Sequence, residues 1–188
     1  MTRKPDELAS AVEQNAGGKA LPPLDQWNPG LLGDMDLLIT RDGSWLFEGK
    51  PIGREAIVRL FSTILRKEQD GAYYLVTPVE KWRIAVEDTP LLAHSAEATG
   101  EGDSQVISVT TNMGETLEIG PDHPLEVGAY PDSEEPRPVV SVRHGVEARL
   151  VTNAFYQLAE FVEEQTVNGE TVLGVFSHGK FWKIGQGG

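Results

Sequence analysis

The sequence predicts an α+β fold made of two related β-rich modules, each a curled antiparallel sheet with one helix. Turns, apolar helix faces and Trp-basic-Ile strands recur at an offset of about 100 residues, which is typical of a duplicated module. In each copy, one stretch of helical apolar period lies between short strands that are bounded by turn dipeptides. The matched pairs are Arg41 and Arg143, Gly71 and Gly169, and Trp82 and Trp182.

The first module is expected over residues 21–90. Asp42-Gly43 is a tight-turn signal between two apolar strands. Within 53–67 the apolar residues are spaced i, i+3, i+4, i+7 and i+8, which predicts one amphipathic helix. The predicted strands cover residues 35–40, 45–47, 73–77 and 82–86.

The second module is expected over residues 91–188, and a β-meander over 91–130 forms its first part. An acidic, proline-rich loop follows at 131–138. After two strands, a helix is expected to begin with Thr152 or Asn153 as its N-cap, and a final hairpin turns at His178-Gly179. The predicted strands cover residues 104–110, 116–119, 139–143, 146–151, 171–176 and 181–184.

Residues 1–20 are polar and rich in small side chains, which leaves two predictions open. They form either a short amphipathic helix or a disordered or loosely ordered arm. Trp27 lies in the extended segment that follows, and we expect it to anchor this segment on the first module.

The 188-residue chain is acidic, with a formal net charge of −13. Such a surface repels phosphate backbones and anionic headgroups, so neither nucleic acid nor a membrane is expected as a partner. The sequence contains no cysteine, which excludes disulfides, thiolate metal sites and a cysteine nucleophile. No apolar stretch is long enough for a membrane span and no secretory signal is evident, so we expect a cytoplasmic protein.

Several short motifs stand out in both halves of the chain. They are Gly33-Asp34-Met35-Asp36, Asp42-Gly43-Ser44-Trp45, Pro51-Ile52, Arg59 to Ser62, Leu65-Arg66, Tyr74 to Lys81, Val86 to Asp88, Val142 to Ala148, Phe155-Tyr156, and Gly174-Val175-Phe176-Ser177. Together these motifs resemble an uncharacterised bacterial family, the domain-of-unknown-function family 1285. The resemblance extends from about Trp27 to Ile184, and the motifs of the first half are the more specific ones.

The resemblance implies a duplicated β-rich core whose second domain is loosely similar to a pleckstrin-homology fold. It also implies a small-ligand site of nucleotide-like chemistry between the two domains, and a role in signal transduction. The sequence departs from the family's pattern at Thr152, where a basic residue is expected just ahead of the second helix. If that basic group holds an anionic ligand, this chain binds the ligand differently or not at all.

The segment from Thr77 to Lys81 joins two predicted strands and has two interpretations. As a ligand-contacting elbow, it would offer the charge of Lys81 and the hydroxyl of Thr77. As a strand corner, it would only use Pro78 to interrupt the sheet's hydrogen bonds.

The first predicted helix carries three arginines that also have two interpretations, Arg54, Arg59 and Arg66. A basic stripe could bind phosphate or carboxylate groups, which guanidinium grips through two hydrogen bonds. The favoured alternative is that these arginines pair with acidic side chains of the same protein. The acidic candidates include Asp34, Asp36 and Asp88.

For the remaining aspartates, tryptophans and histidines with possible functional roles, the sequence favours structural roles. Asp34, Asp36 and Asp42 could bind Mg²⁺, but no ligand series of the EF-hand kind follows them, and no metal is expected. Strand tryptophans that recur between the copies favour core packing over ligand stacking. The histidines lack any metal-binding spacing and are expected in surface turns. These residues are Trp45, Trp82 and Trp182, and His94, His123, His144 and His178.

The sequence therefore supports the hypothesis of a non-enzymatic sensor that holds a small anionic, nucleotide-like ligand between its modules, without a cofactor. Two alternatives remain. One is an interaction adaptor that binds a signalling protein and no small ligand, and the other is a metal-assisted hydrolase using Asp34, Asp36 and Glu80. The expected ligand contacts are Arg59, Lys81 and Arg143 for the anion, Tyr74 and Tyr156 for stacking or hydroxyl hydrogen bonds, and Thr77.

Overall fold

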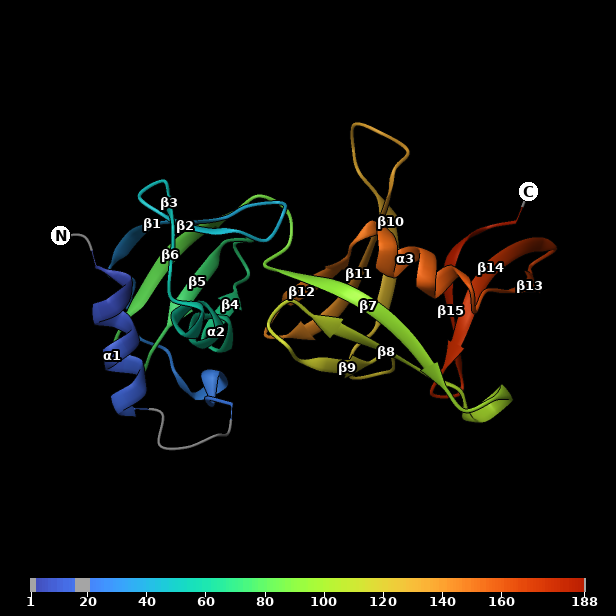
Figure 1. Cartoon of the computed structure of the whole chain (residues 1–188), viewed down its shortest axis with the longest axis horizontal. Helices are drawn as coiled ribbons and strands as arrows, with labels where there is room; N and C mark the ends of the chain where they lie inside the picture. The colour runs from blue at the N-terminus through green and yellow to red at the C-terminus, as the bar shows by residue number, and fades with distance from the viewer. Residues whose placement is uncertain (1–2, 16–20, 188) are drawn as a thin grey trace. The chain divides into compact units, whose positions relative to one another are not determined.

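The computed structural model describes residues 3–15 and 21–187, and the chain divides into two compact units (Figure 1). Unit 1 comprises residues 1–90 together with 143–146, and unit 2 comprises the remainder. The main division therefore falls between Pro90 and Leu91. The four residues 143–146 lie within the sequence range of the expected second module and group with unit 1.

Unit 1 is built on a mixed sheet with the strand order β3-β2-β1-β6-β5-β4. Strands β1 and β6 run parallel, and the chain forms α2 and four further strands between them. The other neighbouring pairs of this sheet are antiparallel. The elements are β1 (Gly33–Ile39), β2 (Trp45–Phe47), β3 (Lys50–Pro51), α2 (Glu55–Thr63), β4 (Leu65–Lys67), β5 (Tyr73–Val76) and β6 (Lys81–Val86).

The core of unit 1 follows from the two periodicities in the sequence. In β1, alternate residues Met35, Leu37 and Ile39 are buried, as expected for a strand with one face on the core. From α2, Ile57 and Phe61 are buried one helical turn apart. Trp45 and Trp82 are buried as well, which confirms their core role.

The described part of residues 1–20 adopts the helical alternative. Helix α1 (Pro5–Asn15) contacts α2, and its Leu8, Ala9 and Val12 are buried. A short 3₁₀ turn, η1 (Leu24–Gln26), follows in the described chain. No helix within the described ranges is long and apolar enough to cross a membrane.

The predicted helix over 53–67 is wrong at its ends, because residues 65–67 form strand β4, which pairs with β5. The hydroxyls of Ser62 and Thr63 donate to the carbonyls of Arg59 and Leu60 at 2.6 Å each, three residues back. Such side-chain bonds compete with the helical hydrogen bonds. The helix therefore ends after Thr63, although the apolar period continues beyond it.

Unit 2 contains a second mixed sheet, with the order β10-β11-β12-β7-β8-β9, and a small antiparallel sheet, β13-β14-β15. In the larger sheet β7 and β12 run parallel. Helix α3 contacts β7, and the buried Trp182 lies on β15. The elements are β7 (Leu91–Thr99), η2 (Gly102–Ser104), β8 (Val106–Thr111), β9 (Thr116–Glu118), β10 (Leu125–Ala129), β11 (Pro136–Arg143), β12 (Val146–Leu150), α3 (Thr152–Ala159), β13 (Glu163–Val167), β14 (Glu170–Ser177) and β15 (Lys180–Gln186).

The α+β class is confirmed, and both halves contain the predicted order of two strands, one helix and two strands. Each half also has a strand after the helix that was not predicted, β4 in one and β13 in the other, and the two-residue β3 ahead of α2 was not predicted either. The sheets are not purely antiparallel, because each of the larger ones has a parallel pair. The two copies also differ in where their last strand pairs. In the first copy the last strand, β6, pairs with β1 of the same sheet. In the second copy the last strand, β15, belongs to a separate small sheet, and β12 pairs with β7 instead.

Candidate functional site

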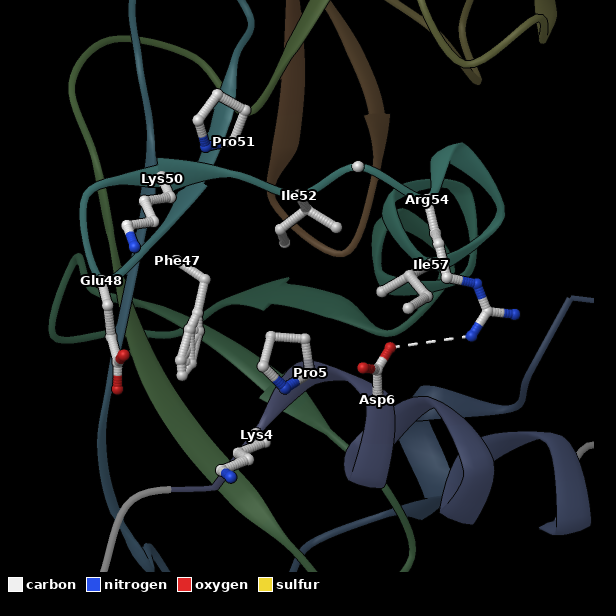
Figure 2. A pocket seen from close by; sticks show the side chains of 11 residues that line it. Lys4, Pro5, Asp6, Phe47, Glu48, Lys50, Pro51, Ile52, Arg54 and Ile57 are labelled. Carbon is white, nitrogen blue, oxygen red and sulfur yellow. Dashed lines mark ion pairs between the residues drawn. The ribbon is translucent and has the colours of Figure 1, made fainter.

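A pocket of about 330 Å³ opens in unit 1 between the start of α1, the β2–β3 turn and the segment that leads into α2 (Figure 2). Small-molecule sites in proteins commonly occupy about 300–1,000 Å³, so this pocket suits a small ligand. Its walls come from residues 4–6, 47–48, 50–54 and Ile57. All of these residues belong to unit 1.

The interior of this pocket is apolar. In Figure 2 the side chains of Pro5, Phe47, Ile52 and Ile57 converge on the same space. Ile57 is buried, and Phe47 is half-buried. A ligand that covers these side chains would remove apolar surface from water, which favours binding.

The rim of the pocket is charged and carries more cations than carboxylates. Arg54 and Asp6 form an ion pair at 3.7 Å, with both side chains largely exposed. Lys4 and Lys50 also line the pocket, and among the described residues neither ammonium group is recorded in an ion pair. With Glu48, the rim has three cations and two carboxylates, whereas the whole chain has a net charge of −13.

The β2–β3 hairpin places an aromatic ring and an ammonium group side by side. Glu48 and Gly49 have φ values of 50° and 80°, the positive values of a two-residue type I′ turn. This turn pairs Phe47 directly with Lys50. Directly paired residues of antiparallel strands point to the same face, so both side chains reach the pocket.

The start of α1 is held by buried side chains and by a two-point ion pair. Arg3 Nη2 donates to Glu80 Oε2 at 3.2 Å, and Arg3 Nε lies 3.0 Å from Glu80 Oε1. Both side chains are mostly shielded from water. Together with the buried Leu8, this contact positions Lys4 and Pro5 at the pocket.

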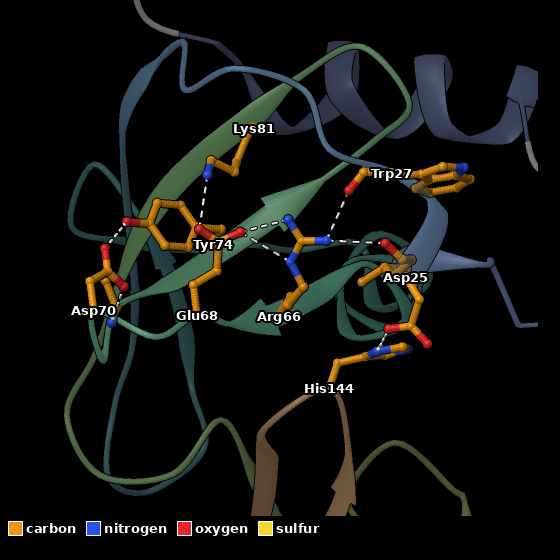
Figure 3. A network of polar contacts seen from close by, with 10 residues as sticks. Asp25, Trp27, Arg66, Glu68, Asp70, Tyr74, Lys81 and His144 are labelled. Atoms are coloured by element: carbon orange, nitrogen blue, oxygen red, sulfur yellow. Dashed lines mark hydrogen bonds and ion pairs between the residues drawn. The ribbon is translucent and has the colours of Figure 1, made fainter.

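A second group of charged side chains in unit 1 is centred on Arg66 (Figure 3). Arg66 Nε and Nη2 donate to Glu68 Oε2 at 3.1 and 2.5 Å. Its Nη1 donates to the backbone carbonyls of Leu24 and Trp27 at 3.0 and 2.9 Å. The guanidinium thus fastens the segment around Trp27 to the sheet through two backbone carbonyls, whereas anchoring by the Trp27 side chain stays a prediction.

Lys81 and Tyr74, two of the predicted ligand contacts, belong to the same network (Figure 3). Lys81 Nζ donates to Glu68 Oε1 at 2.8 Å and lies 4.7 Å from the centre of the Tyr74 ring. The Tyr74 hydroxyl donates to Asp70. The charge of Lys81 is therefore already balanced inside the protein.

These contacts shift the pKa values of three groups. Burial alone would raise the pKa of Glu68, but hydrogen bonds from Lys81 and Arg66 outweigh it and hold that pKa below its usual value. The hydrogen bond from Tyr74 lowers the pKa of Asp70 and raises that of Tyr74. The shifts indicate a set of matched charges that stabilises the fold.

Thr77 contributes to the turn between β5 and β6. Its side chain is buried, and its Oγ1 accepts the N–H groups of Val79 and Glu80 at 3.3 and 2.9 Å. Its own N–H donates to the Glu80 carbonyl at 2.8 Å. These bonds favour the strand-corner interpretation of this segment.

The turn at 143–146 is fastened within unit 1 by His144. His144 Nδ1 lies 3.2 Å from Asp25 Oδ1, and the His144 carbonyl accepts the N–H of Lys67 at 2.9 Å (Figure 3). At Gly145, with φ 76°, an added Cβ would lie 2.9 Å from the Lys67 side chain, so only glycine fits. His144 lies in a turn, as predicted, but its side chain is mostly buried.

The six predicted ligand contacts are distributed over both units. Tyr156 belongs to α3 of unit 2, whereas the other five belong to unit 1. Arg59 is exposed on α2, and Arg143 is half-buried at the end of β11. Sequence reasoning missed Lys4, Phe47 and Lys50; the Gly- and Pro-rich run from Glu48 to Arg54 was the available signal, because such loops often carry binding residues.

Two of the three carboxylates of the predicted hydrolase, Asp34 and Glu80, serve other contacts. Asp34 pairs with Arg83 at 3.2 Å, and Glu80 pairs with Arg3. Within residues 3–15 and 21–187, no three acidic or histidine side chains group closely enough to hold a metal ion. Asp42 accepts hydrogen bonds from the Thr40 hydroxyl and the Ser44 N–H in its turn, and these lower its pKa.

Two further pockets lie among the described residues of unit 2. One, of about 400 Å³, is polar and includes His178, whose Nε2 lies 2.7 Å from Glu118 Oε1. The other, of about 240 Å³, is lined by Tyr156, Thr152 and Arg149, among others. The first has few apolar walls and the second is small, so the pocket of unit 1 is the stronger candidate.

Comparison with known proteins identifies the two halves of the chain. Residues 22–89 match the N-terminal domain of the domain of unknown function DUF1285, and residues 90–184 match its C-terminal domain. No protein of curated function matches the chain.

Two crystal structures of DUF1285 family proteins are similar to this chain. The protein from Silicibacter pomeroyi DSS-3 is 37% identical, with a TM-score of 0.87, over 99% of this chain and 97% of the other. The protein from Shewanella baltica OS155 is 26% identical, with a TM-score of 0.52, over 67% of this chain and 91% of the other. Because both halves match and the resemblance extends over nearly the whole length, the chain belongs to the DUF1285 family.

Proposed function

We propose that this protein is a non-enzymatic small-ligand-binding protein whose ligand occupies the pocket between α1, the β2–β3 turn and the start of α2. The observation that carries the proposal is the pocket itself, which combines an apolar interior with a charged rim. This combination is typical of small-molecule sites, where apolar walls supply affinity and a few polar groups fix orientation.

The network around Arg66 is a weaker choice for the ligand site. Its cations Arg66 and Lys81 share the carboxylate of Glu68, and Arg66 also binds two backbone carbonyls. A ligand anion would have to displace these contacts, which costs free energy. At the pocket, Lys4 and Lys50 require no such exchange with the described residues.

A sensing role belongs to the same proposal. The liganded protein would be read by a protein partner in the cytoplasm, and the lack of cysteine suits that reducing compartment. The position of the ligand between the two modules and its nucleotide-like chemistry stay predictions from the family resemblance.

A thermal-shift screen with a broad library of small anions, cations and neutral compounds tests the proposal. Gly53 lines the pocket, and a Cβ added there meets no atom within 4 Å, so Gly53→Phe should fill the pocket without strain. Gly30 is equally open and lies outside the pocket, which makes Gly30→Phe the matched control.

A ligand at about 100 times its Kd should stabilise the wild type and Gly30→Phe by roughly 2.7 kcal/mol and leave Gly53→Phe unchanged. Equal stabilisation of Gly53→Phe would place the ligand elsewhere. If no compound stabilises the wild type, the adaptor without a small ligand becomes the better hypothesis.

A further inference from the structure

The pocket of unit 1 points to one ligand class and to one conformational consequence of binding. Resting on the proposed function, we propose that the ligand is an amphipathic anion, an apolar chain or ring with one carboxylate-like head, and that its binding holds α1 in its docked position.

The interior selects for an apolar body. Phe47, Ile52, Ile57 and Pro5 face the same space and offer hydrocarbon surface rather than hydrogen-bond donors (Figure 2). A strongly polar ligand such as a sugar would lose its water contacts there without replacement. An alkyl or aryl group has no such cost and gains burial.

The rim selects for a negative head. Arg54 engages the carboxylate of Asp6, which leaves Lys4 and Lys50 against Glu48 as the other charged groups of the lining. The hairpin register places Lys50 beside Phe47. One anionic head near the two ammonium groups, joined to an apolar body over Phe47, therefore matches both features.

The walls come from two parts of unit 1 that are far apart in the sequence. Lys4, Pro5 and Asp6 belong to the start of α1 or directly precede it, and the remaining walls come from β2, β3, α2 and their connections. The family match begins at residue 22, so α1 lies outside the matched N-terminal domain. Three buried side chains of α1 and the Arg3–Glu80 ion pair keep it in place.

The complete pocket exists only when α1 is docked. A ligand that touches both parts binds the docked state better than the undocked state, and it must shift the equilibrium toward docking. Undocking of α1 would conversely expose Leu8, Ala9 and Val12 together with the surface that they cover. Occupation of the pocket would thus control an apolar surface that a partner can detect.

Octanoate, octylammonium and octanol are the probes, because they share one apolar chain and differ in charge. Binding is followed from the NMR signals of Phe47 and Ile52, and docking from amide hydrogen exchange of residues 8–12 in the full chain. Octanoate should bind more than tenfold tighter than octanol, and octylammonium more weakly still. Lys4→Gln should weaken octanoate binding three- to tenfold, whereas Lys183→Gln, at an exposed position on β15, should not.

Octanoate at about 100 times its Kd should slow the exchange of the α1 amides by up to about 100-fold, because exchange requires undocking. Octanoate that shifts Phe47 and Ile52 without slowing this exchange overturns the coupling and leaves the proposed function intact. Octylammonium binding as tightly as octanoate, or a library ligand binding where octanoate does not, overturns the ligand class alone. If neither these probes nor the library bind at the pocket, the proposed function fails and this inference with it.

Discussion

Unit 1 holds two groups of basic side chains, and they differ in where their negative partners are. Arg66 and Lys81 converge on Glu68 within the protein, at 2.5 to 3.1 Å, and all three side chains are mostly shielded from water. Lys4 and Lys50 lie on an exposed pocket rim and are recorded in no ion pair with the described residues.

This difference separates charge used for folding from charge available for binding. A cation with a buried internal partner is strongly coupled to stability, since removal of one partner leaves the other uncompensated. An exposed cation without such a partner contributes little to stability. In a chain with a net charge of −13, the second kind of cation is the better indicator of an anion site.

The largest effect is expected where the pocket depends on α1. Leu8→Ala should lower the free energy of opening of α1 by about 3 kcal/mol, because it removes a fully buried side chain. Amide hydrogen exchange along α1 measures this change. Glu13→Ala, at an exposed position of the same helix, is the control and should have little effect. Unchanged exchange in Leu8→Ala would show that α1 is held by other contacts.

A smaller loss of stability is expected when the Arg66 network is broken. Arg66→Met should cost about 2 kcal/mol in urea unfolding, since Glu68 keeps its charge and the carbonyls of Leu24 and Trp27 lose their donor. Arg83→Met removes an ion pair whose two side chains are about half or more exposed, and it should cost less than about 0.5 kcal/mol. Similar losses in the two variants would remove the distinction between the two groups of cations.

The pH dependence of stability tests the same network. Glu68 and Asp70 have lowered pKa values in the folded protein, so their contribution is complete above the unfolded values of about 4 and is lost as the pH falls through the lower folded values. The pH dependence of the Tyr74 contribution is the opposite, because the pKa of Tyr74 is raised in the folded protein. Its contribution to stability is present below about pH 10 and is lost as the pH rises through the folded pKa. Urea unfolding between pH 5 and 2 should show a shallower acid slope for Glu68→Gln than for the wild type.

The smallest effect on stability is expected at the pocket rim. Lys50→Gln should change the free energy of unfolding by less than about 0.5 kcal/mol, because Lys50 is exposed and no ion pair with it is recorded among the described residues. Thermal unfolding without a ligand measures this difference. A loss comparable to that of Arg66→Met would mean that Lys50 has a structural role.

Much of the fold could be predicted from the sequence because its signals are local. The alternation in β1 and the turns at Asn168-Gly169 and His178-Gly179 depend on neighbouring residues, and these turns have the expected positive φ values. Strand β4 was missed because it is short and follows α2 closely, where the apolar period alone does not mark the change. Strand β13 was missed because four of its five residues are polar and show no alternation of apolar side chains. Strands β1 and β6 are far apart in the sequence, so no local sequence pattern predicts that they pair in parallel.

The candidate site was harder to predict for the same reason. Its walls combine residue 4 with residues near 50, and no short motif joins them. The predicted Lys81 and Tyr74 are indeed close together, but their internal partners Glu68 and Asp70 could not be inferred from spacing. Sequence can identify which residues carry charge, whereas the availability of that charge depends on the tertiary structure.

Unit 1 is built from two separate stretches of the chain, and the second stretch is synthesised much later than the first. The backbone N–H of Lys67 donates to the carbonyl of His144, which is made 77 residues later. A nascent chain that ends at Pro90 contains the whole sheet of unit 1 but lacks the turn at 143–146. Unit 1 can therefore be completed only after most of unit 2 has left the ribosome, which links the maturation of the pocket-bearing unit to translation of the second half of the chain.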